Sequence, residues 1–180
     1  GEIASLSNQI ITLKSQFALS LNSTPSERPH ANIDGTKVVY EMDLNGIRQI
    51  YYVDLLSVDG PELVTRNFDF TENPSQGNGH SLRPRISSDG STVVFHSRAS
   101  NLVTGDFNDQ EDVFLYRTDS KLLMRAQNLY GNNEPNKGSY YPDVNGDGTR
   151  VVFESEATNI QTNGVANSGM QIFLWDLTNG

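Results

Sequence analysis

Short apolar runs separated by turn-forming residues recur along the chain. Three stretches share one pattern. An apolar or small residue stands two positions after a proline, and Asp-Gly, a serine or threonine, Val-Val and an aromatic residue follow. The stretches are PHANIDGTKVVYE (29–41), PRISSDGSTVVFH (84–96) and PDVNGDGTRVVFE (142–154). Asp-Gly between runs of β-branched and aromatic residues is typical of a tight turn that joins two antiparallel strands. Each stretch therefore predicts a β-hairpin.

Further apolar blocks follow each hairpin and predict additional strands. A third block occurs in every copy, as QIYYVDL (49–55), DVFLYRT (112–118) and QIFLWDL (171–177). A fourth block occurs twice, as PELVTRN (61–67) and KLLMRAQ (121–127). A four-stranded antiparallel unit that repeats at this spacing is typical of a β-propeller blade. We therefore predict an all-β fold of β-propeller blades, each a four-stranded antiparallel sheet, in three repeats.

The repeats divide the chain into four parts. Residues 1–27 are predicted to hold an outer strand, QIITL (9–13), and a loop, while 28–82, 83–138 and 139–180 form blades 1, 2 and 3. Blade 3 lacks an outer strand of its own. Propeller rings have about 4–8 blades. The three blades therefore predict half of a six-bladed ring completed by a homodimer, a fragment of a longer propeller, or an open arc.

The segment DVNGDGTRVVFE (143–154) also matches an EF-hand calcium loop. Its first, third, fifth and twelfth positions hold residues of ligand type, which are Asp143, Asn145, Asp147 and Glu154. The equivalent residues in the other two hairpins cannot ligate calcium as an EF-hand does, yet both hairpins keep Asp-Gly and Val-Val. These sets are His30, Asn32, Asp34 and Glu41 in the first hairpin and Arg85, Ser87, Asp89 and His96 in the second. The preceding proline and the β-branched residues of the segment oppose the helices that flank an EF-hand. We therefore predict a structural hairpin here and no metal site.

The charge balance narrows the choice of partners. The 180 residues carry a formal net charge of −9, so neither nucleic acid nor an anionic membrane surface is expected as a partner. The sequence has no cysteine, which excludes disulfides and thiolate chemistry. No apolar run approaches the roughly 20 residues that cross a bilayer, and no signal peptide is recognisable. We expect no membrane insertion, and a protein or peptide as the partner.

The stretch RPRISSDGSTVVFHSRASNLVTGDFNDQEDVFLYRT (83–118) resembles the repeat of the TolB-like β-propeller family of bacterial envelope and secreted proteins. The similarity is close over 83–118, good over 139–177 and looser over 28–55. This resemblance implies a periplasmic or extracellular location in a bacterium. It also implies a propeller that binds protein partners, or one that accompanies a peptidase without catalysing its reaction. Because a fold does not determine a function, the site has to be argued from the residues.

The antiparallel strand order predicts where a site lies. The connections after the second and fourth strands share one face and are mostly long, whereas tight turns occupy the other face. Binding residues usually lie on long loops held by a rigid scaffold. Two residue sets are predicted to line this face and to grip a peptide or a cation: Arg28, Arg83 and Tyr141, which precede the first-strand prolines, and Glu41, His96 and Glu154, which end the second strands. The alternative is that strand ends are polar only because they meet solvent.

The segment GDFNDQEDV (105–113) is the candidate for a metal ion. Asp106, Asn108 and Asp112 could bring several oxygen ligands to one calcium ion. The alternative is that these side chains cap the backbone of their own loop, as Asp and Asn often do. We expect no cofactor, with calcium as the exception to test.

Catalytic motifs are missing from the sequence. The three histidines, His30, His80 and His96, lack the spacing of metal ligands, and residues 79–83 lack the second glycine of a nucleophile elbow. We therefore predict a non-catalytic protein- or peptide-binding propeller module. The alternatives are a propeller domain of a larger hydrolase, either carbohydrate-active or peptidase-associated, and a purely structural repeat segment.

Overall fold

The structure is a computed structural model of the 180-residue chain and describes residues 24–69, 76–127, 134–160 and 169–178. All regular secondary structure in these ranges consists of β-strands. Blade 1 consists of β1 (Ser26–Ala31), β2 (Lys37–Leu44), β3 (Ile47–Asp54) and β4 (Glu62–Leu63). Blade 2 consists of β5 (Ser81–Ile86), β6 (Thr92–Ser97), β7 (Asp112–Arg117) and β8 (Leu123–Arg125). Blade 3 consists of β9 (Ser139–Val144), β10 (Arg150–Ser155) and β11 (Gln171–Asp176).

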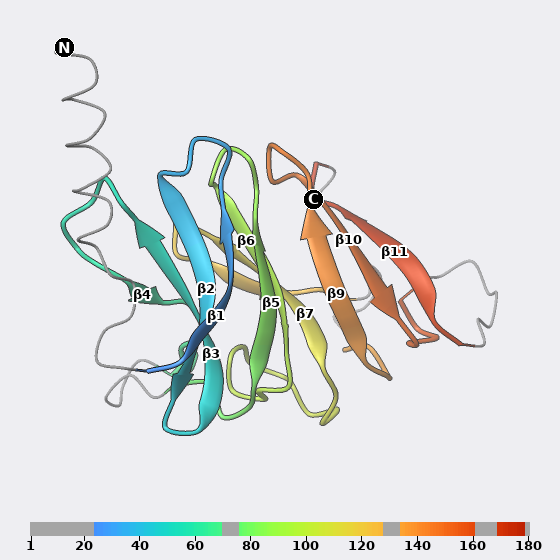
Figure 1. Cartoon of the computed structure of the whole chain (residues 1–180). Coiled ribbons are helices and arrows are strands. Elements are labelled where there is room, and N and C mark those ends of the chain that lie inside the picture. Colours follow the sequence, from blue (N-terminus) through green and yellow to red (C-terminus); the bar gives the residue numbers. More distant parts are fainter. Residues whose placement is uncertain (1–23, 70–75, 128–133, 161–168, 179–180) are drawn as a thin grey trace, which may run out of the picture.

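Each blade is an antiparallel sheet in which strands adjacent along the chain are adjacent in space. The strand orders are β1-β2-β3-β4, β5-β6-β7-β8 and β11-β10-β9. Figure 1 shows the three sheets packed side by side. This arrangement confirms the predicted all-β fold with three blades. β1 and β5 begin two residues before the predicted blade boundaries at 28 and 83, and the outer strand predicted at 9–13 lies outside the described residues.

Asp-Gly builds the turn between the first two strands of each blade. In blade 3, Asp147 Oδ1 accepts hydrogen bonds from the amide and the hydroxyl of Thr149. Gly148 has a φ of +69°, in the left-handed region that glycine enters without steric cost. Gly35 and Gly90 have the same conformation in the other two turns. The dipeptide thus fixes the hairpin through one side-chain acceptor and one permissive backbone position.

The segment that matches an EF-hand loop is one of these hairpins. Asp147 lies in the turn, whereas Glu154 lies four residues beyond the start of β10, about 13 Å along the strand at a rise of about 3.3 Å per residue. They cannot ligate the same ion.

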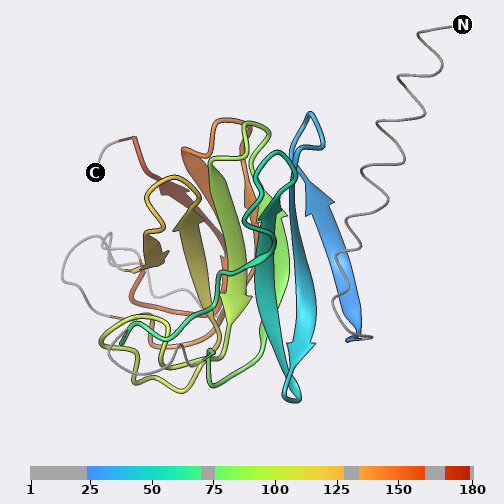
Figure 2. The ribbon, with the colours of Figure 1, turned by 90° about the vertical axis from the view of Figure 1, so that its left-hand side faces the viewer.

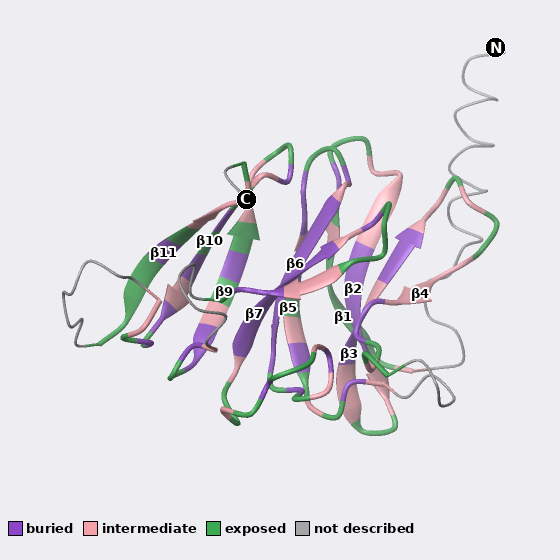
Figure 3. Cartoon of the chain, turned by 180° about the vertical axis from the view of Figure 1, so that it is seen from behind, coloured by how far each residue is buried: buried purple, intermediate pink, exposed green. Residues whose placement is uncertain are grey.

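Apolar layers between neighbouring sheets hold the blades together. Val39 and Ile50 of blade 1 belong to a buried cluster with Phe95 of blade 2, and Val94 of blade 2 belongs to a second cluster with Phe153 of blade 3. All six residues of β6 are buried, as the colouring in Figure 3 shows. A fully buried side chain of this size stabilises the fold by about 1.5–3 kcal/mol. The continuous apolar runs of blades 1 and 2 are therefore strands covered on both faces.

The connections divide between two ends of the blades. The Asp-Gly turns lie at the upper end in Figures 1 and 2, and the loops that follow β6 and β10 lie at the lower end. Blade 1 is the exception on the lower end, because β2 and β3 are joined by the tight turn at Asn45 and Gly46. The ends of β2, β6 and β10, and the bulges of the strands beside them, thus lie toward the end that carries the longer loops.

Candidate functional site

The residue before each first-strand proline has an unusual backbone conformation. Arg28, Arg83 and Tyr141 have φ values of +50°, +56° and +51°. A residue before proline is normally extended, and a left-handed conformation costs a non-glycine residue roughly 1–2 kcal/mol. At each of these points the first strand has one residue more than its partner, which is a β-bulge. Strain that recurs in three blades indicates a requirement of the fold or of a site.

These bulges leave three side chains exposed along the first strands. The Arg28 side chain is 45% exposed and Tyr141 is 47% exposed, and Arg83 is also exposed. Arg83 lies over the Tyr141 ring, with its guanidinium carbon 4.5 Å from the ring centre, which is a cation–π contact. Within the described part of the chain, Arg83 forms no ion pair. We call Arg28, Arg83 and Tyr141 the bulge row.

Glu41 is a fully buried carboxylate that joins blade 1 to blade 2. Its Oε1 accepts a hydrogen bond from the backbone amide of Arg83 at 2.7 Å. Both of its oxygens accept from Arg28 Nη1, at 3.0 and 3.1 Å, and Oε2 also accepts from Arg48 Nη1 at 3.2 Å. A buried charge needs such partners because water no longer solvates it. The carboxylate is therefore used between blades and is covered from ligands.

His96 occupies the corresponding position between blades 2 and 3. Its side chain is 5% exposed, its Nδ1 lies 2.8 Å from Glu111 Oε2, and its ring centre is 5.5 Å from that of Tyr141. Burial lowers the pKa of His96, as does the Arg83 guanidinium, while the Glu111 carboxylate acts in the opposite direction. Its Nε2 has no hydrogen-bond partner among the described residues. A catalytic triad would need a nucleophile bonded to this nitrogen.

Glu154 occupies the same position in blade 3, where no described blade follows. It is half-buried at the end of β10, opposite Ile172 of β11. No hydrogen bond or ion pair joins its carboxylate to the described residues. The structure thus separates the six predicted site residues into three exposed side chains, two buried groups and one open carboxylate.

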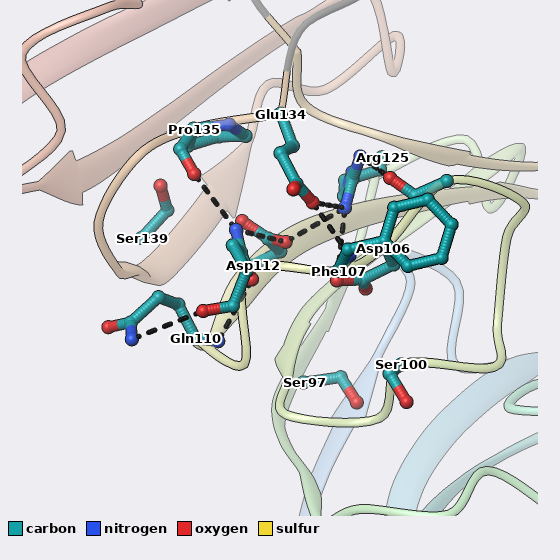
Figure 4. Close-up of polar contacts among 12 residues, drawn as sticks. Ser97, Ser100, Asp106, Phe107, Gln110, Asp112, Arg125, Glu134, Pro135 and Ser139 are labelled. Atoms are coloured by element: carbon teal, nitrogen blue, oxygen red, sulfur yellow. Dashed lines mark hydrogen bonds and ion pairs between the residues drawn. The ribbon is translucent and has the colours of Figure 1, made fainter.

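A second cluster of charges surrounds Arg125 of β8 and is shown in Figure 4. Its Nη1 lies 3.1 Å from Asp106 Oδ1, 3.2 Å from Asp112 Oδ2 and 3.2 Å from Glu134 Oε2. Its Nη2 donates to the Gly105 carbonyl at 2.9 Å. The side chains of Arg125, Asp106 and Asp112 are at most 4% exposed. This network fastens the loop after β6 and the connection to blade 3 onto the outer strand of blade 2.

The predicted calcium ligands belong to this network. Asp106 and Asp112 face the Arg125 guanidinium, which supplies the positive charge that a cation would supply. Asn108 directs its Nδ2 toward Asp112 Oδ2 and the Pro135 carbonyl, and its Oδ1 accepts the Gln110 amide. In the described ranges, no group of three His, Cys, Asp or Glu residues has the geometry of a metal site. The polar side chains of this loop thus bind the backbone of the loop and the Arg125 guanidinium.

The sequence analysis did not identify Arg125. Gln49 stands at the position of Asp112 in blade 1 and is hydrogen-bonded to Thr65 in the interior. The strand register places Leu63, and not Thr65, at the position of Arg125. The repeats thus show a buried polar residue at the start of the third strand, but they do not identify Arg125 as its partner.

Asp112 makes the stability of the protein depend on pH. Burial, reinforced by the nearby Asp106 charge, raises the pKa of Asp112 to about 7, while Arg125 and Asn108 act in the opposite direction. The folded state therefore keeps a proton that the unfolded chain releases near pH 4. The free energy of unfolding then falls by up to about 1.4 kcal/mol per pH unit from this group as the pH rises from about 4 to 7.

We expect Asp112→Asn to remove this contribution from urea unfolding curves recorded between pH 4.5 and 8. Asp147→Asn is the control, because hydrogen bonds from Thr149 lower the pKa of Asp147 and confine its effect to more acidic solution. Parallel pH profiles for the wild type and Asp112→Asn would contradict the prediction.

Two hollows, of about 460 and 450 Å³, lie at the outer side of blades 1 and 2, away from the bulge row. Both are lined in part by Glu62, Arg66 and Lys121, and the second also contains Phe68 and Leu122. Lys121 pairs with Glu62 at 2.7 Å. No described helix is long and apolar enough to cross a membrane.

The sequence matches no protein-family model and no curated protein sequence. Solved structures do match its fold. A protein assigned as TolB in Agrobacterium tumefaciens is 21% identical with a TM-score of 0.54, over 89% of this chain and 48% of that one. TolB from Acinetobacter baumannii is 20% identical with a TM-score of 0.51, over 90% of this chain and 32% of that one. The β-propeller domain of the Trilobed protease from Pyrococcus furiosus is 11% identical with a TM-score of 0.51, over 87% of this chain and 40% of that one.

The fold and these similarities define the class of protein. The chain is a β-propeller module, built from blades of the type found in bacterial TolB structures and in the propeller domain of a protease. Its fold is TolB-like, as the resemblance of its repeats implied. The chain spans about half the length of the Agrobacterium structure and a third of the Acinetobacter structure.

Proposed function

We propose that the chain is a non-catalytic module that binds a protein or a peptide through the bulge row. The observation that carries this proposal is the repeated, strained bulge that leaves the side chains of Arg28, Arg83 and Tyr141 exposed. The buried contacts between blades use the Arg83 amide, not its side chain. The side chain is thus available to a ligand.

The chemistry of the row favours a partner that carries a carboxylate. Arg83 presents a guanidinium that lies on an aromatic ring and pairs with no carboxylate of the described residues, and a planar guanidinium binds a carboxylate through two parallel hydrogen bonds. Arginine and tyrosine are also the residue types that contribute most often to binding hot spots. In a chain with a net charge of −9, a cation of this kind selects acidic groups locally.

The similarity to TolB structures supports a location in the periplasm or outside a bacterial cell, which we propose for this protein as well. A second candidate function is a propeller domain of a larger hydrolase, peptidase-associated or carbohydrate-active. The similarity to the propeller domain of the Trilobed protease favours it. The polypeptide encoded by the full-length gene distinguishes the two, since the second requires a hydrolase domain in the same protein.

Selection from a displayed peptide library on the immobilised chain tests the binding proposal. We expect the selected peptides to share Asp, Glu or a free C-terminus. For such a peptide, Arg83→Ala should raise the Kd by about 10–100-fold in fluorescence anisotropy, which is the size of a hot-spot effect. The melting temperature should change little, because the Arg83 amide remains in place.

Lys121→Ala is the matched control, since this lysine is an exposed cation on the outer side of the blades. An equal loss of affinity in Lys121→Ala, or a selection without acidic peptides, would count against the bulge row.

A further inference from the structure

One face of blade 3 exposes apolar side chains that have no cover in the structure. Val152, Ile172 and Leu174 are 44%, 70% and 59% exposed. They lie together, because Val152 pairs with Leu174 and Ile172 pairs with Glu154 across β10 and β11. Figure 3 shows β11 largely in the colour of exposed residues. We call Val152, Ile172 and Leu174 the blade 3 face.

The same three positions are buried in the other two blades. Their equivalents are Val39, Ile50 and Tyr52 in blade 1, and Val94, Val113 and Leu115 in blade 2, and none of these six is more than 6% exposed. The first strand of the next blade covers them, since β5 contacts β1, β2 and β3, and β9 contacts β5, β6 and β7. The chain thus contains two complete interfaces between neighbouring blades, and blade 3 carries one side of a third interface of the same kind.

The polar part of that interface is present as well. In blade 1, Glu41 of the second strand accepts a hydrogen bond from the amide of Arg83, which is the bulged residue of the first strand of blade 2. Glu154 is the same residue type at the same position, and it has no partner among the described residues. A strand that covers the blade 3 face is therefore expected to bring a bulged residue before a proline.

β5 and β9, the first strands of blades 2 and 3, each cover the preceding blade. β1, the first strand of blade 1, covers no described blade. Five of its six residues are exposed, and it carries the same bulge at Arg28, before Pro29, that β5 and β9 carry. From this match of surface, bulge and acceptor, we propose that the blade 3 face binds β1 of a second copy of this chain, with Glu154 accepting the Arg28 amide.

Two-fold symmetry completes the arrangement. Each copy offers one β1 and one blade 3 face, so two such contacts close a ring of six blades and leave neither element uncovered. A closed ring also covers an apolar face that would otherwise favour aggregation. This inference rests on the packing between blades and is independent of the proposed peptide binding, which is tested at the Arg83 side chain.

Sedimentation velocity on the whole chain measures the outcome. We expect the wild type at micromolar concentration to sediment as a dimer, with twice the chain mass of 19.9 kDa. Leu174→Asp should sediment as a folded monomer with an unchanged circular dichroism spectrum. Leu122→Asp is the matched control, because Leu122 is 51% exposed on the outer side of blade 2, and it should remain dimeric. A monomeric wild type, an assembly larger than two chains, or equal behaviour of the two variants would overturn the proposal.

Cysteine cross-linking tests which element fills the face. The chain has no cysteine, so Glu154→Cys and Arg28→Cys each introduce a unique thiol. We expect a disulfide-linked dimer when the two variants are mixed and mildly oxidised, and far less cross-linking in either variant alone. Efficient cross-linking of each variant with itself, or none in the mixture, would exclude β1 as the occupant of the blade 3 face.

Discussion

Replacing Arg125 by methionine is expected to lower the free energy of unfolding by about 3–5 kcal/mol, the usual cost of leaving buried charges without their partner. Arg125 is the only cation within ion-pair distance of Asp106 and Asp112 in the described part of the chain, and all three side chains are almost inaccessible to water. Urea unfolding at pH 8, above the pKa of about 7 that Asp112 has in the wild-type protein, measures the effect. The loss should shrink toward pH 5, because protonation of Asp112 removes one of the unpaired charges.

A double variant supplies the matched control for this experiment. Asp112→Gln with Arg125→Met removes a carboxylate together with the guanidinium, and its glutamine is the residue that blade 1 has at this position, Gln49. Neutral replacements of a buried ion pair often restore stability, so we expect the double variant to recover at least half of the loss. A loss below about 1 kcal/mol for the single Arg125 variant would show that the network does not stabilise blade 2.

Glu41→Ala should cost about 3 kcal/mol of unfolding free energy. The substitution removes hydrogen bonds from two guanidinium groups and leaves the Arg83 amide without an acceptor, and a buried unsatisfied donor costs about 1–3 kcal/mol by itself. The partly exposed side chains of Arg28 and Arg48 can be solvated again, which keeps the total at the lower end for buried ion pairs. Thermal and urea unfolding measure the change.

Two further variants separate the causes. Glu41→Gln keeps an oxygen for the Arg83 amide but loses the charge, so we expect about half of the loss seen with alanine. Glu27→Ala is the control, because Glu27 also pairs with Arg48, at 2.9 Å, but is 48% exposed. Its loss should stay below about 1 kcal/mol, as for other surface ion pairs. Equal effects of the Glu41 and Glu27 variants would contradict the role given to burial.

The fold could be predicted from the sequence because each blade contains its own turn and strand signals. Asp34-Gly35, Asp89-Gly90 and Asp147-Gly148 each specify a turn, and the Val-Val-aromatic runs specify strands, which in blades 1 and 2 are covered on both faces. These signals agree with one another and recur at a regular spacing. Local and global preferences therefore lead to the same structure, which is the condition under which prediction from pattern succeeds.

The site was predictable in position but not in chemistry. The sequence predicts Arg28 and Arg83 directly before the first-strand prolines and Glu41 at the end of the second strand. The last of these predictions is wrong, because β2 continues beyond Glu41 to Leu44. The sequence does not reveal that Arg83 adopts a left-handed conformation before a proline, since that conformation runs against the local preference of the chain. Only this bulge brings the Arg83 amide to Glu41. Whether a polar residue at a strand end faces solvent or a neighbouring blade thus depends on a tertiary contact.

The main-chain nature of the Arg83–Glu41 bond has a consequence for how this scaffold can diversify. Every residue except proline carries an amide proton, so cohesion between blades places little restriction on which side chain stands at that position. Arginine in two blades and tyrosine in the third already illustrate this freedom. Residues of the bulge row can therefore change one at a time during evolution while the main-chain hydrogen bond between the blades is kept.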